Sequence, residues 1–240
     1  MDTRLFAFVG GDIGLWRIIG TKTIVGKPLP EAKRLNVISA SELQPETNAP
    51  WVLRGITSNE RYVMREEKNE IVAKQQGLAR PEATCAALIP IRKNAAWWEF
   101  TQDERRRVFE KSKHIQIGLN YLPAVARKLH HCRDLSENEP FDFLNWFEFA
   151  PIHEAEFNTL LSELRAAEEW KYVDREVDIR LVREAAYGAG ALAQGGGRSP
   201  PGRPARTLTG FMAARWWQSS AYPSRWRKRL FQRLRCCAHR

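Results

Sequence analysis

The stretch ATCAALIPIRKNAAWWEFTQDERRRVFEKSKHIQIGLNYLPAVARKLHHCRD (residues 83–134) decides the fold of this chain. It opens with a short apolar run, 83–91, that is typical of a buried strand and stops at a polar segment, 92–94. Apolar residues then recur at helical spacing, which predicts one helix that begins after Thr101 and ends before Pro123. Residues 125–135 read as a further strand.

The residues that follow complete a regular alternation. FDFLNWFEF (141–149) predicts a strand that pairs with 125–135 around the polar turn at 136–140. Pro151 fits the first turn of a helix over 152–169, and residues 171–182 alternate as a last strand. The resulting order is β-α-β-β-α-β, the ferredoxin-like unit, in which both helices cover one face of an antiparallel sheet.

The first third of the chain predicts a reduced version of the same unit. Four strand-like runs, LFAFVG (5–10), LWRII (15–19), LNVIS (35–39) and WVLRGI (51–56), precede one long helix at about 58–76. We therefore expect an α+β fold of paired ferredoxin-like units. The predicted boundaries are 1–81 for the N-terminal unit and 82–183 for the C-terminal unit.

The positive charge of the chain is concentrated in its last segment. Of 38 Lys and Arg and 28 Asp and Glu residues, eleven and one lie in 184–240, which leaves 27 of each before it. The net charge of +10 therefore gives no reason to expect that the body binds nucleic acid. The Gly/Pro/Ala-rich and Arg/Trp-rich composition of 184–240 predicts a disordered basic tail. It could contact RNA or a membrane surface, or have no selected role.

The cysteines and the N-terminus predict a protein of a reducing compartment. Cys85, Cys132, Cys236 and Cys237 show neither a C-x-x-C spacing nor the density of a disulfide framework. The start MDTRLFAFVGGDIGLW lacks the basic region and cleavage site of a secretory signal, and no apolar run reaches membrane-spanning length. We expect a cytoplasmic protein without a membrane span.

Several segments resemble one family in the order in which they occur. They are IPIRKNAAWWEFTQDERR (89–106), KSKHIQIGLNYLPAVARKLHHCRD (111–134), PFDFLNWFEFAP (140–151) and LRAAEEWKYVDREVDIRLVR (164–183). Together they resemble the chlorite dismutase family, and within it the short, dimeric branch, over residues 4–183. A dimeric α+β barrel is the architecture that this resemblance implies for the paired units. The resemblance implies a homodimer with haem b, whose iron converts the small anion chlorite to chloride and dioxygen through a ferryl haem and hypochlorite, a detoxifying reaction.

The resemblance assigns roles on the ligand side of this haem. His114 is implied as the iron ligand, with the haem lying between sheet and helices. Glu169 is implied as the acceptor of the other ring N–H of His114, which fixes the tautomer and raises ligand basicity. The neighbouring Glu168 is an alternative acceptor. From the residues alone, other histidines remain rival ligands: His130, His131, His153 and His239.

Arg127 is the residue that the resemblance places on the substrate side. An arginine stays charged and cannot accept a proton, but it can hold an anion over the iron. A solvated strand arginine, as expected for Arg133, is the alternative interpretation.

A supporting group is also implied by the resemblance. Tyr62 and Lys93 match positions near the haem propionates, Trp97 a position against the haem, and Trp98 a position nearer the subunit contact. Two adjacent tryptophans at a helix start are otherwise ordinary core residues.

Two further hypotheses compete with a chlorite dismutase. One is a coproheme decarboxylase of the same superfamily, but that branch lacks the distal arginine that Arg127 would provide. The other is a non-catalytic haem-binding protein that uses the basic tail as its contact element. Haem binding without oxygen release from chlorite would favour either of these over the dismutase.

Overall fold

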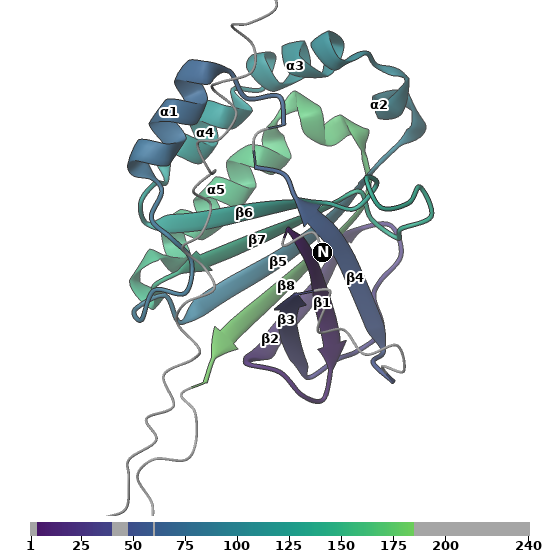
Figure 1. Cartoon of the computed structure of the whole chain (residues 1–240), viewed down its shortest axis with the longest axis vertical. Helices are drawn as coiled ribbons and strands as arrows, with labels where there is room; N and C mark the ends of the chain where they lie inside the picture. The colour runs from purple at the N-terminus through teal and green to yellow at the C-terminus, as the bar shows by residue number, and fades with distance from the viewer. Residues whose placement is uncertain (1–3, 40–47, 60, 185–240) are drawn as a thin grey trace, which may run out of the picture. The chain divides into compact units, whose positions relative to one another are not determined.

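The computed structural model describes residues 4–39, 48–59 and 61–184, which form eight strands and a layer of helices (Figure 1). The elements in chain order are β1 (Leu5–Gly11), β2 (Trp16–Val25), β3 (Arg34–Ser39), β4 (Trp51–Thr57), α1 (Arg65–Lys74), β5 (Cys85–Lys93), α2 (Ala95–Glu99), α3 (Gln102–Lys111), α4 (His114–Asn120), β6 (Val125–His131), β7 (Phe143–Phe149), the short turn η2 (Pro151–His153), α5 (Glu154–Ala166), the short turn η3 (Glu168–Tyr172) and β8 (Val173–Arg183).

The eight strands form one closed barrel in the order β1-β3-β2-β8-β5-β7-β6-β4. Within the second half of the chain the order β8-β5-β7-β6 is that of a ferredoxin-like sheet, whose first strand lies between its fourth and third. The first half repeats the pattern as β4-β1-β3-β2, and every pairing is antiparallel. The predicted α+β, ferredoxin-like class is confirmed, and both predicted units contribute four strands to the same barrel.

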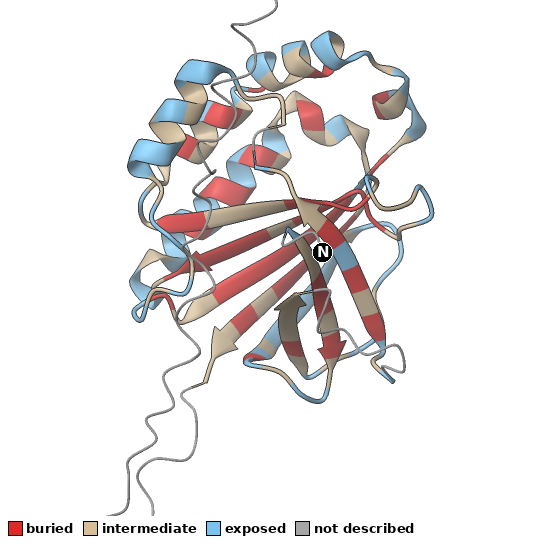
Figure 2. Cartoon of the chain, in the orientation of Figure 1, coloured by how far each residue is buried: buried red, intermediate tan, exposed pale blue. Residues whose placement is uncertain are grey.

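The two faces of the β5–β8 sheet bury different side chains because successive residues of a strand point to opposite faces. One face fills the barrel with residues that include Leu88, Leu144 and Trp146, which belong to the same core cluster as Phe8 of β1. The other face lies under the helices and packs residues of β5 and β7 against α5. Figures 1 and 2 show the helices gathered over this second face. The space available for a ligand therefore lies outside the barrel, between sheet and helices.

The helical region differs from the predicted single helix of 101–122. Thr101 precedes α3, and its backbone N–H donates to Glu104 at 2.7 Å. The chain then turns at Lys113, whose φ of +52° lies in the left-handed region and ends the first helix. A second helix, α4, begins at His114. The apolar spacing continues across this break, so the sequence pattern does not reveal it.

Glu184, which directly follows β8, forms ion pairs with two arginines of the barrel. Its carboxylate pairs with Arg17 at 2.6 Å and also with Arg34. Apart from Glu184, the segment predicted as a basic tail lies outside the described residues. None of the described helices is long and apolar enough to cross a membrane.

Candidate functional site

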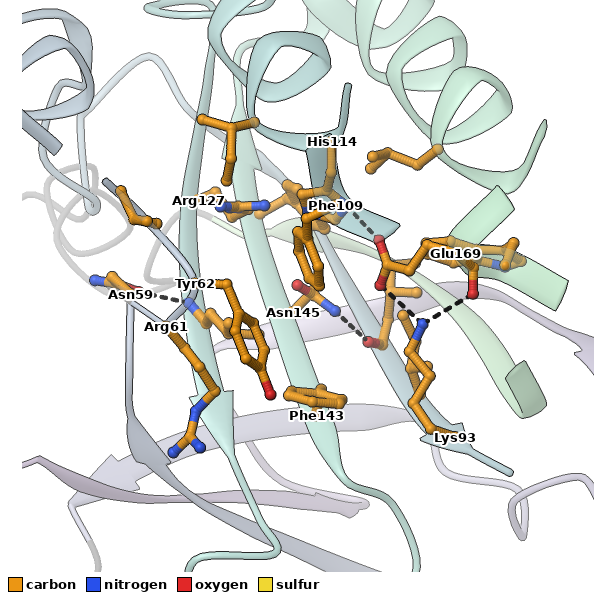
Figure 3. A pocket seen from close by; sticks show the side chains of 18 of the residues that line it. Asn59, Arg61, Tyr62, Lys93, Phe109, His114, Arg127, Phe143, Asn145 and Glu169 are labelled. Atoms are coloured by element: carbon orange, nitrogen blue, oxygen red, sulfur yellow. Dashed lines mark hydrogen bonds and ion pairs between the residues drawn. The ribbon is translucent and has the colours of Figure 1, made fainter. Parts of the chain in front are cut away.

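A large cavity lies between the helix-facing side of β5–β7 and the helices α3, α4 and α5 (Figure 3). The space between these elements is about 720 Å³, a volume that includes solvent at its open side. Most of its wall is aliphatic or aromatic. Its polar side chains are Asn59, Arg61, Tyr62, Lys93, His114, Arg127, Asn145 and Glu169.

His114 enters the cavity as the first residue of α4. The left-handed turn at Lys113 directly before it aims the imidazole at the sheet instead of along the axis of α3. Its Nδ1 lies 2.6 Å from Glu169 Oε2, within hydrogen-bonding distance. The Nε2 atom, on the other side of the ring, has no hydrogen-bond partner among the described residues and is the nitrogen available to a ligand.

Glu169 occupies the centre of a buried polar cluster. Its backbone N–H donates to Ser112 Oγ at 3.1 Å, and its Oε1 accepts a hydrogen bond from Lys93 Nζ at 2.8 Å. Burial by itself would raise the pKa of the Glu169 carboxyl. The charges and hydrogen bonds of His114 and Lys93 outweigh that effect and hold the pKa well below its usual range.

The two adjacent carboxylates of η3 have different partners. Glu169 faces His114, whereas Glu168 pairs with Lys111 at 2.8 Å near the surface. The pairing with Lys111 lowers the pKa of Glu168. The structure therefore distinguishes two candidates that the sequence left open.

Lys93 differs from its expected role beside cofactor carboxylates. Only 2% of its side chain is exposed, and a buried ammonium requires a counter-charge. Glu169 supplies it, and Nζ also donates to the Glu169 backbone carbonyl at 3.2 Å. The faces of Trp97 and Trp170 lie 4.7 and 5.5 Å from Nζ. The Lys93 ammonium is thus paired with the Glu169 carboxylate and is not free to bind a cofactor carboxylate.

The two tryptophans also lie deeper than expected. Trp97 is fully buried behind Lys93 and does not line the cavity, so the expected contact with a cofactor is replaced by packing on Phe109 and Tyr172. Trp98 is half-buried, and its Nε1 donates to Asp142 at 3.3 Å.

Arg127 projects from β6 into the cavity from the sheet side (Figure 3). Burial lowers the pKa of its guanidinium, while the charge of Glu169 acts in the opposite direction. Within the described part of the chain it forms neither an ion pair nor a hydrogen bond. Arg133, on the same β-hairpin, pairs with Glu137 at 2.9 Å. A charged donor group without an ion-pair partner in an apolar cavity can bind an anion.

The cavity mouth is formed by the segment that follows β4. Tyr62, in the left-handed region with φ of +63°, accepts a hydrogen bond from Arg105 at 3.3 Å. Arg61 pairs with Asp134 at 2.6 Å, while its Nε is buried without a partner. The sequence interpretation missed Asn59, Arg61 and Asn145. Asn59 and Arg61 could have been proposed because they are polar residues just after the end of β4. Asn145 lies within β7, and no local sequence pattern marks it as a cavity residue.

The rival histidines do not line the cavity. His130 lies inside the barrel with ring contacts to Phe6 and Phe8, and burial lowers its pKa to about 3. His131 is buried beside Asp134, 2.8 Å away. His153 pairs with Glu156 at 3.2 Å on the helix-side surface, and His239 lies outside the described residues.

The donors in the cavity fit a haem better than a bare metal ion. No group of three His, Cys, Asp or Glu that could chelate an ion occurs in the part of the chain described here. A porphyrin supplies four nitrogen ligands itself and requires from the protein an axial imidazole and apolar walls. His114 and the aliphatic and aromatic lining meet both requirements.

A second, smaller cavity adjoins the first at Arg127. Its space is about 380 Å³ with open solvent included, and it shares Arg127, Phe147 and Leu164 with the larger one. Its remaining wall comes from α1, α4, α5, their flanks and the start of β6: Ile71, Gln75, Gly118, Leu122, Val125 and Leu160. Arg127 therefore lines both cavities.

Comparison with known proteins identifies relatives that belong to one family. A family model described as chlorite dismutase matches residues 28–184. A chlorite dismutase of Ideonella dechloratans is 31% identical over 122 residues, which is 50% of this chain and 40% of that protein. The chain thus spans less than half of the length of this curated relative.

Solved structures give the same result. The dimeric chlorite dismutase of Nitrobacter winogradskyi is 54% identical, covers 74% of this chain and 99% of its own, and superposes with a TM-score of 0.68. A chlorite dismutase of Candidatus Nitrospira defluvii in complex with imidazole has 18% identity and a TM-score of 0.52 over 74% of this chain and 90% of its own. At that identity it shows only that the fold is shared.

Proposed function

The chain belongs to the chlorite dismutase family, and from this we propose that it is a haem b enzyme that converts chlorite to chloride and dioxygen. The reaction ClO₂⁻ → Cl⁻ + O₂ balances in atoms and charge without a further reductant. Two features of the cavity support the proposal: an imidazole with a free Nε2 and an unpaired guanidinium. The second of these carries it, since a partly buried cation that forms no ion pair in an apolar cavity calls for an anionic partner.

His114 would hold the haem iron through Nε2, and the apolar walls would pack against the macrocycle. Tyr62 and Arg61, which also line the cavity, would bind its carboxylates. Bound haem would supply the redox chemistry that cleaves and forms the chlorine–oxygen and oxygen–oxygen bonds. Glu169, 2.6 Å away, would accept the Nδ1 proton of His114 and so fix the tautomer that presents Nε2 to the iron. Lys93 keeps Glu169 ionised in its buried position.

Arg127 would bind chlorite and retain the hypochlorite anion until the oxygen–oxygen bond forms. Its guanidinium offers several N–H donors and keeps its charge, so it stabilises anions without exchanging a proton. The apolar surroundings strengthen this attraction because few waters compete for the charge. The smaller cavity beside Arg127 would provide room for these small species.

We extend the proposal to the state and place of the protein. The family resemblance supports a homodimer that acts in the cytoplasm and removes chlorite. Analytical ultracentrifugation of the haem-loaded chain would measure whether it is a dimer.

The deciding experiment measures oxygen release from chlorite by haem-reconstituted protein with an oxygen electrode. We expect prompt release that approaches one O₂ per chlorite. Arg127→Ala should keep haem but lower turnover and release hypochlorite to a chlorination trap, because the anion-binding group is lost. Arg133→Ala is the matched control, since it removes an arginine of the same hairpin that lies outside the cavity. Haem binding without oxygen release in the parent protein would overturn the proposal.

A further inference from the structure

Asp142 is a buried carboxylate that lies one step beyond the cluster of His114, Glu169 and Lys93. It is 7% exposed and directly precedes β7. Its Oδ2 accepts two hydrogen bonds, from the Lys93 backbone N–H at 2.7 Å and from Trp98 Nε1 at 3.3 Å. Asp142 is thus joined to the residue whose ammonium binds Glu169.

The Lys93 N–H needs this acceptor because the strand ladder ends there. The last register pair between β5 and β7 is Ile91 with Phe143, and the pairing of β5 with β8 shifts between Arg92 and Lys93. Such irregularities redirect side chains and often lie beside functional sites. A buried N–H outside the ladder must find another partner, which is the Asp142 carboxylate.

The position of Asp142 is itself fixed from both sides. Its backbone N–H donates to Ile91 O at 2.9 Å, and its carbonyl accepts from the Cys132 N–H at 2.8 Å. The carboxylate is therefore held between the ends of β5 and β6. Hydrogen bonds lead from this point through Lys93 to Glu169, whose Oε2 lies 2.6 Å from His114 Nδ1.

We propose that Asp142 is a positioning residue for the proximal site: by holding the Lys93 backbone at the end of β5, it places the ammonium on Glu169 Oε1 and leaves Oε2 for His114. This inference rests on the proposed function, because it concerns the residue that would bind the haem iron. The effect passes through a hydrogen bond to the Lys93 backbone and not through the charge of Asp142.

Glu148 offers a matched control with the same chemistry at another place. It is 3% exposed, and its carboxylate also accepts one backbone N–H, from Ala79 at 2.5 Å, and one indole N–H, from Trp146 at 2.9 Å. It faces away from the cavity. Glu148→Ala therefore removes an equivalent buried carboxylate without touching the cluster around Glu169.

The test compares Asp142→Ala, Asp142→Asn and Glu148→Ala as haem-loaded proteins, with the iron–histidine stretching frequency of the ferrous form as the readout. Asp142→Ala should lower this frequency and weaken haem binding about tenfold, the lower end for groups that orient a metal ligand. Asp142→Asn keeps an oxygen acceptor for the Lys93 N–H and should stay close to the parent. Glu148→Ala should lose stability without a shift in frequency.

Crystals of the cofactor-free variants give a second readout, the distance from Lys93 Nζ to Glu169 Oε1, which is 2.8 Å in the parent. We expect it to lengthen only in Asp142→Ala. If that variant does not fold, Asp142→Glu, which moves the carboxylate by one methylene, should show the same shift in smaller degree. Unchanged frequency and distance, an equal shift in Glu148→Ala, or an equal shift in Asp142→Asn would overturn the inference. A parent protein that binds no haem would instead refute the proposed function.

Discussion

At the scale of single residues, the sequence indicates which side chains bring chemistry but not which partners they find. His114, Glu169 and Arg127 all line the cavity, as the family resemblance implies. Lys93 lines it too, yet its ammonium binds Glu169 and not a ligand. The pairing joins residues 76 positions apart, and only the folded sheet brings them within 2.8 Å. Which buried charged residues pair with each other therefore could not be predicted from the local sequence.

The pairing of Lys93 with Glu169 leads to a prediction for the cofactor-free protein. Glu169→Gln should lower the free energy of unfolding by about 3–5 kcal/mol, because it leaves the Lys93 ammonium buried without a counter-charge. Adding Lys93→Met should recover part of that loss, since it removes the orphaned charge as well. Urea unfolding of the three proteins measures both values. A double variant that is less stable than Glu169→Gln would contradict the argument.

The role of His114 can be tested by its removal. His114→Ala deletes the imidazole but leaves the apolar walls, so we expect haem affinity to fall by at least about tenfold and the spectrum of bound haem to change. Haem titration followed by absorbance measures both quantities. His153→Ala, a change on the helix-side surface, is the control and should bind haem as the parent does. A native spectrum in His114→Ala would exclude it as the ligand.

At the scale of elements, strands were easier to predict than helix breaks. The predicted strands over 83–91, 125–135 and 141–149 correspond to β5, β6 and β7, with ends that differ by a few residues. The predicted helix from 101 to 122 is two helices, because Lys113 adopts a left-handed conformation that no residue type there announces. The contact between His114 and Glu169, which lie 2.6 Å apart, favours this break between α3 and α4.

The backbone at Lys113 makes a prediction about the entry to α4. Lys113→Val should destabilise the protein by about 1–2 kcal/mol and weaken haem binding, because a β-branched residue strongly disfavours positive φ. Lys113→Gly should hold stability within about 1 kcal/mol, since glycine adopts this conformation without strain but costs more entropy on folding. Thermal unfolding and haem titration of both variants measure the effects. Equal behaviour of valine and glycine would show that the turn does not direct His114.

Gly118 in the middle of α4 allows the smaller cavity to be filled. A Cβ built at this residue meets no other heavy atom within 4 Å, so Gly118→Leu should project into the cavity without displacing its walls. We expect stability to rise by up to about 1 kcal/mol, because leucine favours helix over glycine. Chlorite turnover should fall while haem stays bound, since the space beside Arg127 is lost.

Gly77→Leu is the control for this prediction. Gly77 is exposed, and its Cβ would also meet nothing within 4 Å. Both variants therefore add the same side chain, but only Gly118→Leu fills a cavity. If Gly118→Leu releases oxygen as the parent does while crystallography shows the leucine in the smaller cavity, that cavity is not needed for the reaction.

At the scale of the whole molecule, the residue pattern predicts the strand order within each half, whereas a barrel was expected only from the family resemblance. The two seams between the halves are β2 with β8 and β4 with β6, and they join strands far apart in the chain. The first seam extends from Trp16–Arg183 to Val25–Glu176, whereas the second has only the pairs Ile56–His131 and Thr57–His130. The short seam is thus the weaker closure, and two buried histidines belong to it.

These histidines make the short seam sensitive to acid. Burial lowers the pKa of His130 to about 3, with Lys128 adding to the effect. Burial and Arg61 lower the pKa of His131 to about 4, although Asp134 opposes the shift. In the unfolded chain both would titrate near 6.5. Since the unfolded state binds more protons between about pH 4 and 6.5, the free energy of unfolding must fall as the pH decreases through this window.

We therefore expect stability to drop by about 1.4 kcal/mol per pH unit for each histidine within the window, and the β4–β6 seam to open first. Urea unfolding at several pH values measures the slope, and His130→Leu should reduce it by about half because one titrating group is removed. Hydrogen exchange locates the opening: protection factors of β4 and β6 amides should fall between pH 7 and 5 before those of β2 and β8. Simultaneous loss of protection at both seams would mean that the barrel opens as one unit, and an unchanged slope in His130→Leu would assign the acid sensitivity to other groups.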